Sequence, residues 1–104
     1  MPRYIIKLQD VDRDYYLMWS TIVDAPITFG LTLGQFRDWY QAEYGKAGLT
    51  EFPERMLRVE QKGTSSNMHP SAEKVIGYNR AGPDETCLTR EQILEKYCRQ
   101  RPVK

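Results

Sequence analysis

The sequence contains one histidine and two cysteines, a small supply of the side chains that bind metals or form disulfides. Cys87 and Cys98 are eleven residues apart, which on a helix is about 16 Å and beyond the reach of a disulfide. A zinc site would need both cysteines and His69, yet the short C-x-x-C and H-x-x-x-H spacings are missing. We therefore expect two free thiols, no metal and no cofactor.

Long apolar runs are also missing from the sequence. No stretch approaches the roughly 18 to 20 apolar residues that a membrane helix requires. The first ten residues, MPRYIIKLQD, lack the apolar segment and the small-residue cleavage site of a secretory signal. These absences predict a cytoplasmic protein that does not enter a membrane.

The sequence has almost no net charge, but its charges are unevenly distributed. Residues 1–95 carry 11 basic and 14 acidic side chains, whereas the last nine residues carry no acid and four basic residues, Lys96, Arg99, Arg101 and Lys104. Such an end is usually a solvated, frayed terminus, which we expect for residues 100–104. The alternative function is a small nucleic-acid-binding protein that uses these four residues.

A calcium loop is suggested by three acidic residues at alternate positions, Asp10, Asp12 and Asp14. The rest of the required pattern is absent, because Tyr15 occupies the glycine position and Thr21 occupies the position of the bidentate glutamate. We interpret the three aspartates as turn-forming residues and as charges that protect a sheet edge.

Two stretches near the start of the sequence have the pattern of strands. Residues 3–8 alternate as in a half-buried strand, with one side formed by Tyr4, Ile6 and Leu8. A second apolar run spans residues 15–23 and ends before Pro26, which cannot donate to a sheet ladder. The polar link between the two runs predicts an antiparallel hairpin.

The strongest helix signal follows residue 30. Thr32 and Gln35 have the spacing of a capping box, and Gly45 provides a left-handed stop, so we expect a helix over residues 33–44. Its buried face is predicted to consist of Leu33, Phe36, Tyr40 and Tyr44.

A second capping box, formed by Thr89 and Gln92, predicts the start of a C-terminal helix. Two weaker helices are predicted over residues 53–61 and 70–79. The sequence therefore predicts a single α+β domain, residues 1–104, in which an N-terminal antiparallel hairpin packs on about four short helices. The two open edges of the hairpin could also accept a strand from a second copy, which would give a homodimer.

The stretch GTSSNMHPSAE, residues 63–73, contains the histidine close to two serines. Ser65 and Ser66 precede His69 by four and three residues, so a serine–histidine contact is feasible, and a small hydrolase is a third alternative. The G-x-S-x-G elbow and the lysine of a phosphate-binding loop are both missing. We interpret the stretch as a polar link between two helices and predict no catalytic residue.

Several short motifs in the sequence are similar to those of a known group of proteins. They are WSTIVDAP at 19–26, EYG at 43–45, KGTSS at 62–66 and NRAGP at 79–83, followed by the helix start at Leu88 and Thr89. Together they resemble small accessory proteins of actinobacterial phages and prophages, a group without an assigned activity. The resemblance covers most of the sequence and implies a phage-encoded protein that acts by binding a host protein. It assigns no functional residue.

Aromatic residues are concentrated between residues 15 and 44, where eight of the twelve occur. Such residues can form a core, but tyrosine, tryptophan and arginine are also enriched in interface hot spots. On the predicted helix Trp39 lies about 100° from the buried face, so we expect it to be partly exposed. We predict that Trp39, with Tyr16 or Arg37, anchors a host protein or a second subunit, and that the protein is a non-enzymatic binding module or inhibitor.

Overall fold

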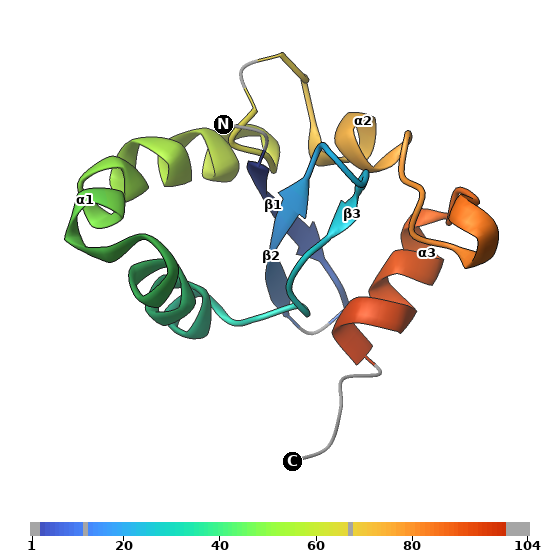
Figure 1. Ribbon diagram of the computed structural model, residues 1–104, viewed down its shortest axis with the longest axis horizontal. Coiled ribbons are helices and arrows are strands. Elements are labelled where there is room, and N and C mark those ends of the chain that lie inside the picture. Colours follow the sequence, from blue (N-terminus) through green and yellow to red (C-terminus); the bar gives the residue numbers. More distant parts are fainter. Residues whose placement is uncertain (1–2, 12, 67, 100–104) are drawn as a thin grey trace.

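A small antiparallel sheet forms the centre of the fold. The computed structural model describes residues 3–11, 13–66 and 68–99. Strands β1 (Arg3–Gln9) and β2 (Asp14–Ser20) form the expected hairpin, in a register that pairs Ile6 with Leu17. A third strand, β3 (Ala25–Pro26), pairs with the end of β2 and makes the strand order β1-β2-β3 (Figure 1). The α+β class predicted from the sequence is confirmed.

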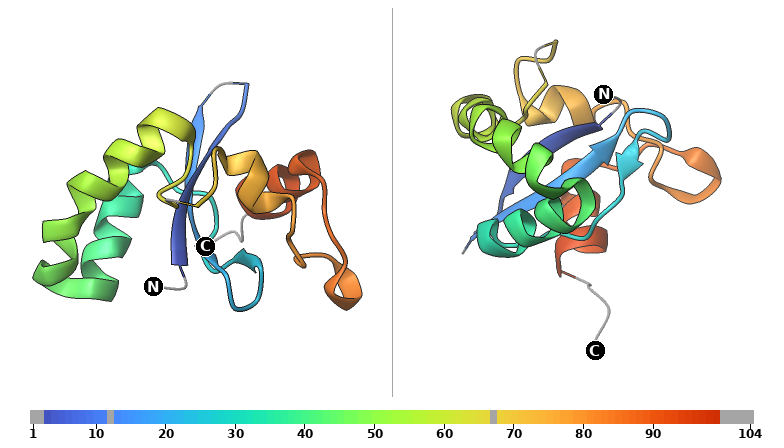
Figure 2. Two further views of the ribbon diagram at one scale, coloured as in Figure 1. Left: turned by 90° about the horizontal axis from the view of Figure 1, so that it is seen from above. Right: turned by 60° about the vertical axis from the view of Figure 1, so that its left-hand side comes forward.

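The sheet is the middle of three layers. Helix α1 (Leu33–Lys62) covers one face, and α2 (Ala72–Ile76) and α3 (Arg90–Ile93) cover the other, as the left view of Figure 2 shows. The expectation of a half-buried strand is therefore wrong for β1, because Ile5 and Ile6 point to opposite faces and both are fully buried.

Each face of the sheet has its own hydrophobic core. The core under α1 consists of Ile5, Tyr16, Met18, Phe36, Tyr40, Phe52, Met56 and Val59. The core under α2 and α3 consists of Ile6, Leu8, Leu17, Trp19, Ala72, Val75, Ile76, Ala81, Ile93, Leu94 and Cys98. Four of the eight aromatic residues between 15 and 44 are thus buried, and three more are partly buried against these cores.

Helix α1 is bent sharply at Gly45, whose φ of 69° and ψ of −162° are not helical. The two arms fold against each other through aromatic rings, with 4.9 Å between the ring centroids of Tyr40 and Phe52 (Figure 2). The sequence predicts that Gly45 ends a helix, but the helix resumes directly after the bend and ends at Gly63. The described residues accordingly contain three α-helices rather than about four.

The buried face of α1 also begins later than predicted. Leu33 is 46% exposed, whereas Phe36 is fully buried. Leu33 belongs to the first turn of the helix, which precedes the part that packs on the sheet, so the helical period alone places it wrongly in the core.

Both edges of the hairpin are covered by the chain itself, contrary to the expectation of open edges. At the edge of β1 the Lys7 N–H donates to the Gly63 carbonyl at 2.8 Å, and the Ser65 N–H donates to the Ile5 carbonyl at 3.0 Å. At the edge of β2, beyond β3, Tyr16 and Leu31 exchange two backbone hydrogen bonds of 2.8 and 2.9 Å. A strand from a second copy would have to displace one of these segments.

The C-terminal part is less regular than predicted. The helix expected over residues 70–79 is limited to the five residues of α2, and a short 3-10 turn follows at η1 (Pro83–Glu85). Buried Asn79 holds the loop after α2, since its amide group donates to the carbonyls of Ile76 at 2.6 Å and Leu88 at 2.7 Å. Helix α3 continues directly into a π-helical segment, η2 (Leu94–Arg99).

Both capping boxes predicted from the sequence are confirmed, and they generate the first prediction. Thr32 and Thr89 each accept a hydrogen bond from the backbone three residues later, at 3.2 and 3.1 Å. Thr32→Ala and Thr89→Ala should each lower the free energy of unfolding by about 1 kcal/mol in urea titrations. Thr50→Ala, an exposed change within α1, is the control and should cost less. Equal effects from all three changes would contradict the capping assignment.

Candidate functional site

The GTSS stretch is an ordered part of the fold rather than a solvated link. Thr64, Ser65 and Ser66 are all buried along the edge of β1. The Ser65 hydroxyl accepts a hydrogen bond from the Ile5 N–H at 2.8 Å, and the Ser66 N–H donates to the Thr64 hydroxyl at 3.2 Å. The sequence correctly places Gly63 as the helix stop but misses that the following residues complete the sheet edge.

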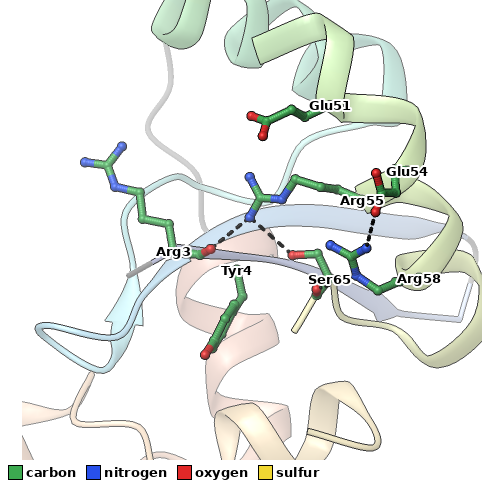
Figure 3. Close-up of a pocket in the computed structure, with 7 residues that line it drawn as sticks. All are labelled: Arg3, Tyr4, Glu51, Glu54, Arg55, Arg58 and Ser65. Atoms are coloured by element: carbon green, nitrogen blue, oxygen red, sulfur yellow. Dashed lines mark hydrogen bonds and ion pairs between the residues drawn. The ribbon is translucent and has the colours of Figure 1, made fainter. Parts of the chain in front are cut away.

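An open pocket of about 250 Å³ lies between this stretch, the start of β1 and the second arm of α1 (Figure 3). Its lining residues are Arg3, Tyr4, Glu51, Glu54, Arg55, Arg58 and Ser65. Three arginines and two glutamates make it strongly polar, so its chemistry is the recognition of charge rather than of apolar groups.

Arg55 is the central cation of the pocket. The residue is half-buried, and its guanidinium donates to the Tyr40 hydroxyl at 2.8 Å, to the Arg3 carbonyl at 2.8 Å and to the Ser65 hydroxyl at 3.3 Å. It also lies 5.8 Å from the centre of the Tyr40 ring. These three acceptors are uncharged, and within the described part of the chain no carboxylate pairs with Arg55.

The other two arginines of the pocket are arranged differently. Arg58 donates from Nε to the Ser65 carbonyl at 2.8 Å and lies 3.4 Å from Glu54, whose side chain is 81% exposed. Arg3 extends away from Arg55, as Figure 3 shows, toward the Tyr44 hydroxyl at 2.9 Å and Glu43 at 3.4 Å. The hydrogen bond to Tyr44, and then Glu43, raise the pKa of the Arg3 guanidinium.

The serine and histidine considered for a hydrolase do meet. The Ser66 hydroxyl is 2.7 Å from Nδ1 of His69, but Ser66 is buried and also accepts from the Met68 N–H at 3.1 Å. The His69 ring lies edge-on to Tyr4, with 5.6 Å between ring centroids. Among the described residues no carboxylate forms a hydrogen bond or ion pair with His69, so the third group of a triad is missing there. Ser66, which would be the nucleophile, is buried.

The three residues predicted to bind a partner differ in burial. Tyr16 is only 6% exposed, and its hydroxyl donates to Glu60 at 3.0 Å. Burial and this carboxylate raise the pKa of Tyr16 to about 12, and the side chain packs in the core under α1. Trp39 is half-buried, as expected, and packs on Phe36 with 5.8 Å between ring centroids. Arg37 is exposed.

Four exposed apolar side chains flank β3 in the sequence and were not predicted. We call them the β3 surface, which is defined as Ile22, Val23, Ile27 and Phe29. A small pocket of about 150 Å³ at its edge is lined by Pro26, Ile27, Thr28, Phe29 and Tyr97. The sequence assigns residues 15–23 to a strand, but β2 ends at Ser20, which leaves two apolar residues of that run in the exposed turn.

The basic residues of the nucleic-acid alternative are partly engaged within the fold. Lys96 donates to the Ala81 carbonyl at 2.8 Å and lies over the Tyr97 ring. Arg99 lies 2.5 Å from Asp10 and also pairs with Glu91 and Glu95. Arg101 and Lys104, and the frayed tail predicted at 100–104, lie outside the described residues. Lys96 and Arg99, the two of these residues that the structure describes, therefore already bind groups within this chain.

The remaining candidates for metal binding lie apart. Cys98 is buried and Cys87 is exposed, and neither forms a disulfide. Asp10 pairs with Arg99 and Asp14 with Lys7, while Asp12 lies outside the described residues. Among residues 3–11, 13–66 and 68–99, no group of three potential metal ligands is assembled.

Over the same ranges, no helix has the length and apolar character to cross a bilayer.

Comparisons with protein-family models, curated proteins and solved structures find no match for this chain.

The second prediction concerns Ser65. Ser65→Ala removes the hydroxyl that accepts from the Ile5 N–H and from Arg55. Because the Ile5 N–H is buried, leaving it without an acceptor should lower the free energy of unfolding by about 1 to 3 kcal/mol in urea titrations. A loss below about 0.5 kcal/mol, the usual range for surface changes, would indicate that this stretch is the simple link expected from the sequence.

The third prediction concerns the ion pair between Asp10 and Arg99. The Arg99 hydrogen bond, with the Val11 N–H, lowers the pKa of Asp10 from 3.8 to about 2. The folded carboxylate thus binds a proton less readily than the unfolded one, and its stabilisation is present above about pH 4 and is lost between pH 4 and pH 2.

We therefore expect Asp10→Asn to be less stable than the wild type at neutral pH, with the difference shrinking as the pH falls from 4 to 2. Thermal unfolding followed by circular dichroism over this range measures the effect. Asp38→Asn, at an exposed residue of α1, controls for the loss of one acidic side chain. A difference that does not change with pH would show that the ion pair does not stabilise the fold.

Proposed function

We propose that this chain is a non-enzymatic protein-binding module that docks through the β3 surface. The observation that supports this proposal is the concentration of exposed apolar side chains on one short segment. Among the described residues nine large hydrophobic side chains are exposed, and four of them lie within residues 22–29. Ile22 and Val23 are 77% and 53% exposed, which is costly in water unless a partner covers them.

The segment that carries this surface is held in a fixed shape. The Ile27 N–H donates to the Met18 carbonyl at 2.8 Å, and the Met18 N–H donates to the Thr28 hydroxyl at 3.1 Å. The turn before β3 is tied to the loop after α2, because the Arg80 N–H donates to the Asp24 carbonyl at 2.8 Å. A surface that is already ordered loses little conformational entropy on binding, which favours recognition over random hydrophobic contact.

The pocket between Phe29 and Tyr97 suggests how a partner is recognised. The two rings are 6.4 Å apart between centroids, and the lining is mainly apolar. We propose that one apolar side chain of the partner enters this pocket and that Ile22 and Val23 provide further apolar contacts. Following the resemblance to phage proteins, the proposed partner is a protein in the cytoplasm of a bacterial host, and binding inhibits or redirects it.

The fourth prediction tests this surface with a double variant, Ile27→Ser with Phe29→Ser. Host proteins captured on the immobilised wild-type chain should be lost from the variant, with affinity for an identified partner falling by about 2 kcal/mol or more. Met68→Ser is the matched control, because Met68 is 83% exposed and lies outside the β3 surface. Circular dichroism of both variants should show an intact fold.

Other outcomes of the same measurement would revise the proposal. Retention of the partner by the double variant, together with its loss from Trp39→Ala, would move the interface to α1, where the sequence places it. Sedimentation of the wild type tests whether the chain forms a homodimer. Self-association that the double variant abolishes would identify a second copy as the partner.

A further inference from the structure

The charge of Arg55 has no counter-ion within the described residues, although this residue is half-buried. Three of its five N–H groups bind uncharged acceptors, which leaves one N–H on Nε and one on Nη1 without a partner there. A cation that is partly removed from water and fixed in position favours an anion beside it, since charge-assisted hydrogen bonds are about twice as strong as neutral ones.

Glu51 would be the expected counter-ion, because it stands four residues before Arg55 on α1. The two side chains do not form an ion pair, since Arg55 is drawn inward to the Arg3 carbonyl and to Ser65 (Figure 3). Glu51 is exposed, and its carboxylate forms no hydrogen bond or ion pair with the described residues. The pocket thus keeps one positive and one negative group apart.

Arg58 adds a second cation on the same side of the pocket. Ser65 holds both guanidinium groups, because its hydroxyl accepts from Arg55 and its carbonyl accepts from Arg58. The link from Arg58 to Glu54 is long, at 3.4 Å, and Glu54 is mostly exposed, so this pair is weak and leaves Arg58 able to bind a ligand.

We propose that this pocket binds a small zwitterion of the α-amino acid class. The ligand carboxylate accepts hydrogen bonds from Arg55 and Arg58, and its ammonium group pairs with Glu51. A phosphate dianion fits less well, because Glu51 and Glu54 at the rim would repel its second charge. The site is built from Ser65, Arg55 and Arg58 and is separate from the proposed β3 surface, which shares no residue with it.

The experiment is a titration of the full chain followed by NMR, using four probes at constant pH and ionic strength. Glycine carries both charges, acetate carries the carboxylate alone, methylammonium carries the amine alone, and inorganic phosphate is the competing anion. We expect glycine to shift the amide signals of Ile5 and Ser65 at lower concentration than acetate, and methylammonium to shift neither.

Two glutamate variants separate the role of Glu51 from a general effect of charge. Glu51→Gln should weaken glycine binding about threefold, the effect of one exposed ion pair, and leave acetate binding no weaker. Glu54→Gln, a matched change in the same pocket, should not weaken glycine binding. Phosphate binding tighter than glycine, acetate binding equal to glycine, an unchanged affinity in Glu51→Gln or no binding of glycine would each overturn the proposal.

Discussion

A two-stranded hairpin that is apolar on both faces is the constraint on which this fold depends. Such a hairpin is unstable alone, because burying one face leaves the other in contact with water. In this chain Ile5 and Met18 point to one side and Ile6 and Leu17 to the other, so helices are needed on both sides. The chain must then pass from the sheet to one face and from that face to the other, and both of these segments run along a sheet edge.

The two candidate surfaces arise at these two segments. The segment from β2 to α1 runs along the outer edge of the sheet and exposes Ile22, Val23, Ile27 and Phe29. The segment from α1 to α2 runs along β1, where Ser65 bonds to the β1 backbone as a residue of a neighbouring strand would. Ser65 also accepts hydrogen bonds from Arg55 and Arg58. The backbone that closes an edge therefore also positions the side chains available for binding.

Local signals in the sequence were sufficient for part of this structure. The hairpin, both capping boxes and the stop at Gly63 depend on neighbouring residues, and each is present. The bend at Gly45 and the burial of Ser65 depend on contacts with distant segments, which no local pattern contains. The pocket was missed for the same reason, because Arg3 and Arg55 are brought together only when α1 packs on the sheet.

The face of the hairpin that contains Ile6 and Trp19 has a consequence for synthesis on the ribosome. Its cover comes from residues 72–98, the last part of the described chain to be made. Arg99 then reaches back to Asp10, and Arg90 donates to the Gln9 carbonyl at 2.5 Å. While residues 90–98 are still inside the exit tunnel, the part of this face that Ile93, Leu94 and Cys98 cover stays exposed, so the nascent chain presents apolar area to chaperones until these residues emerge.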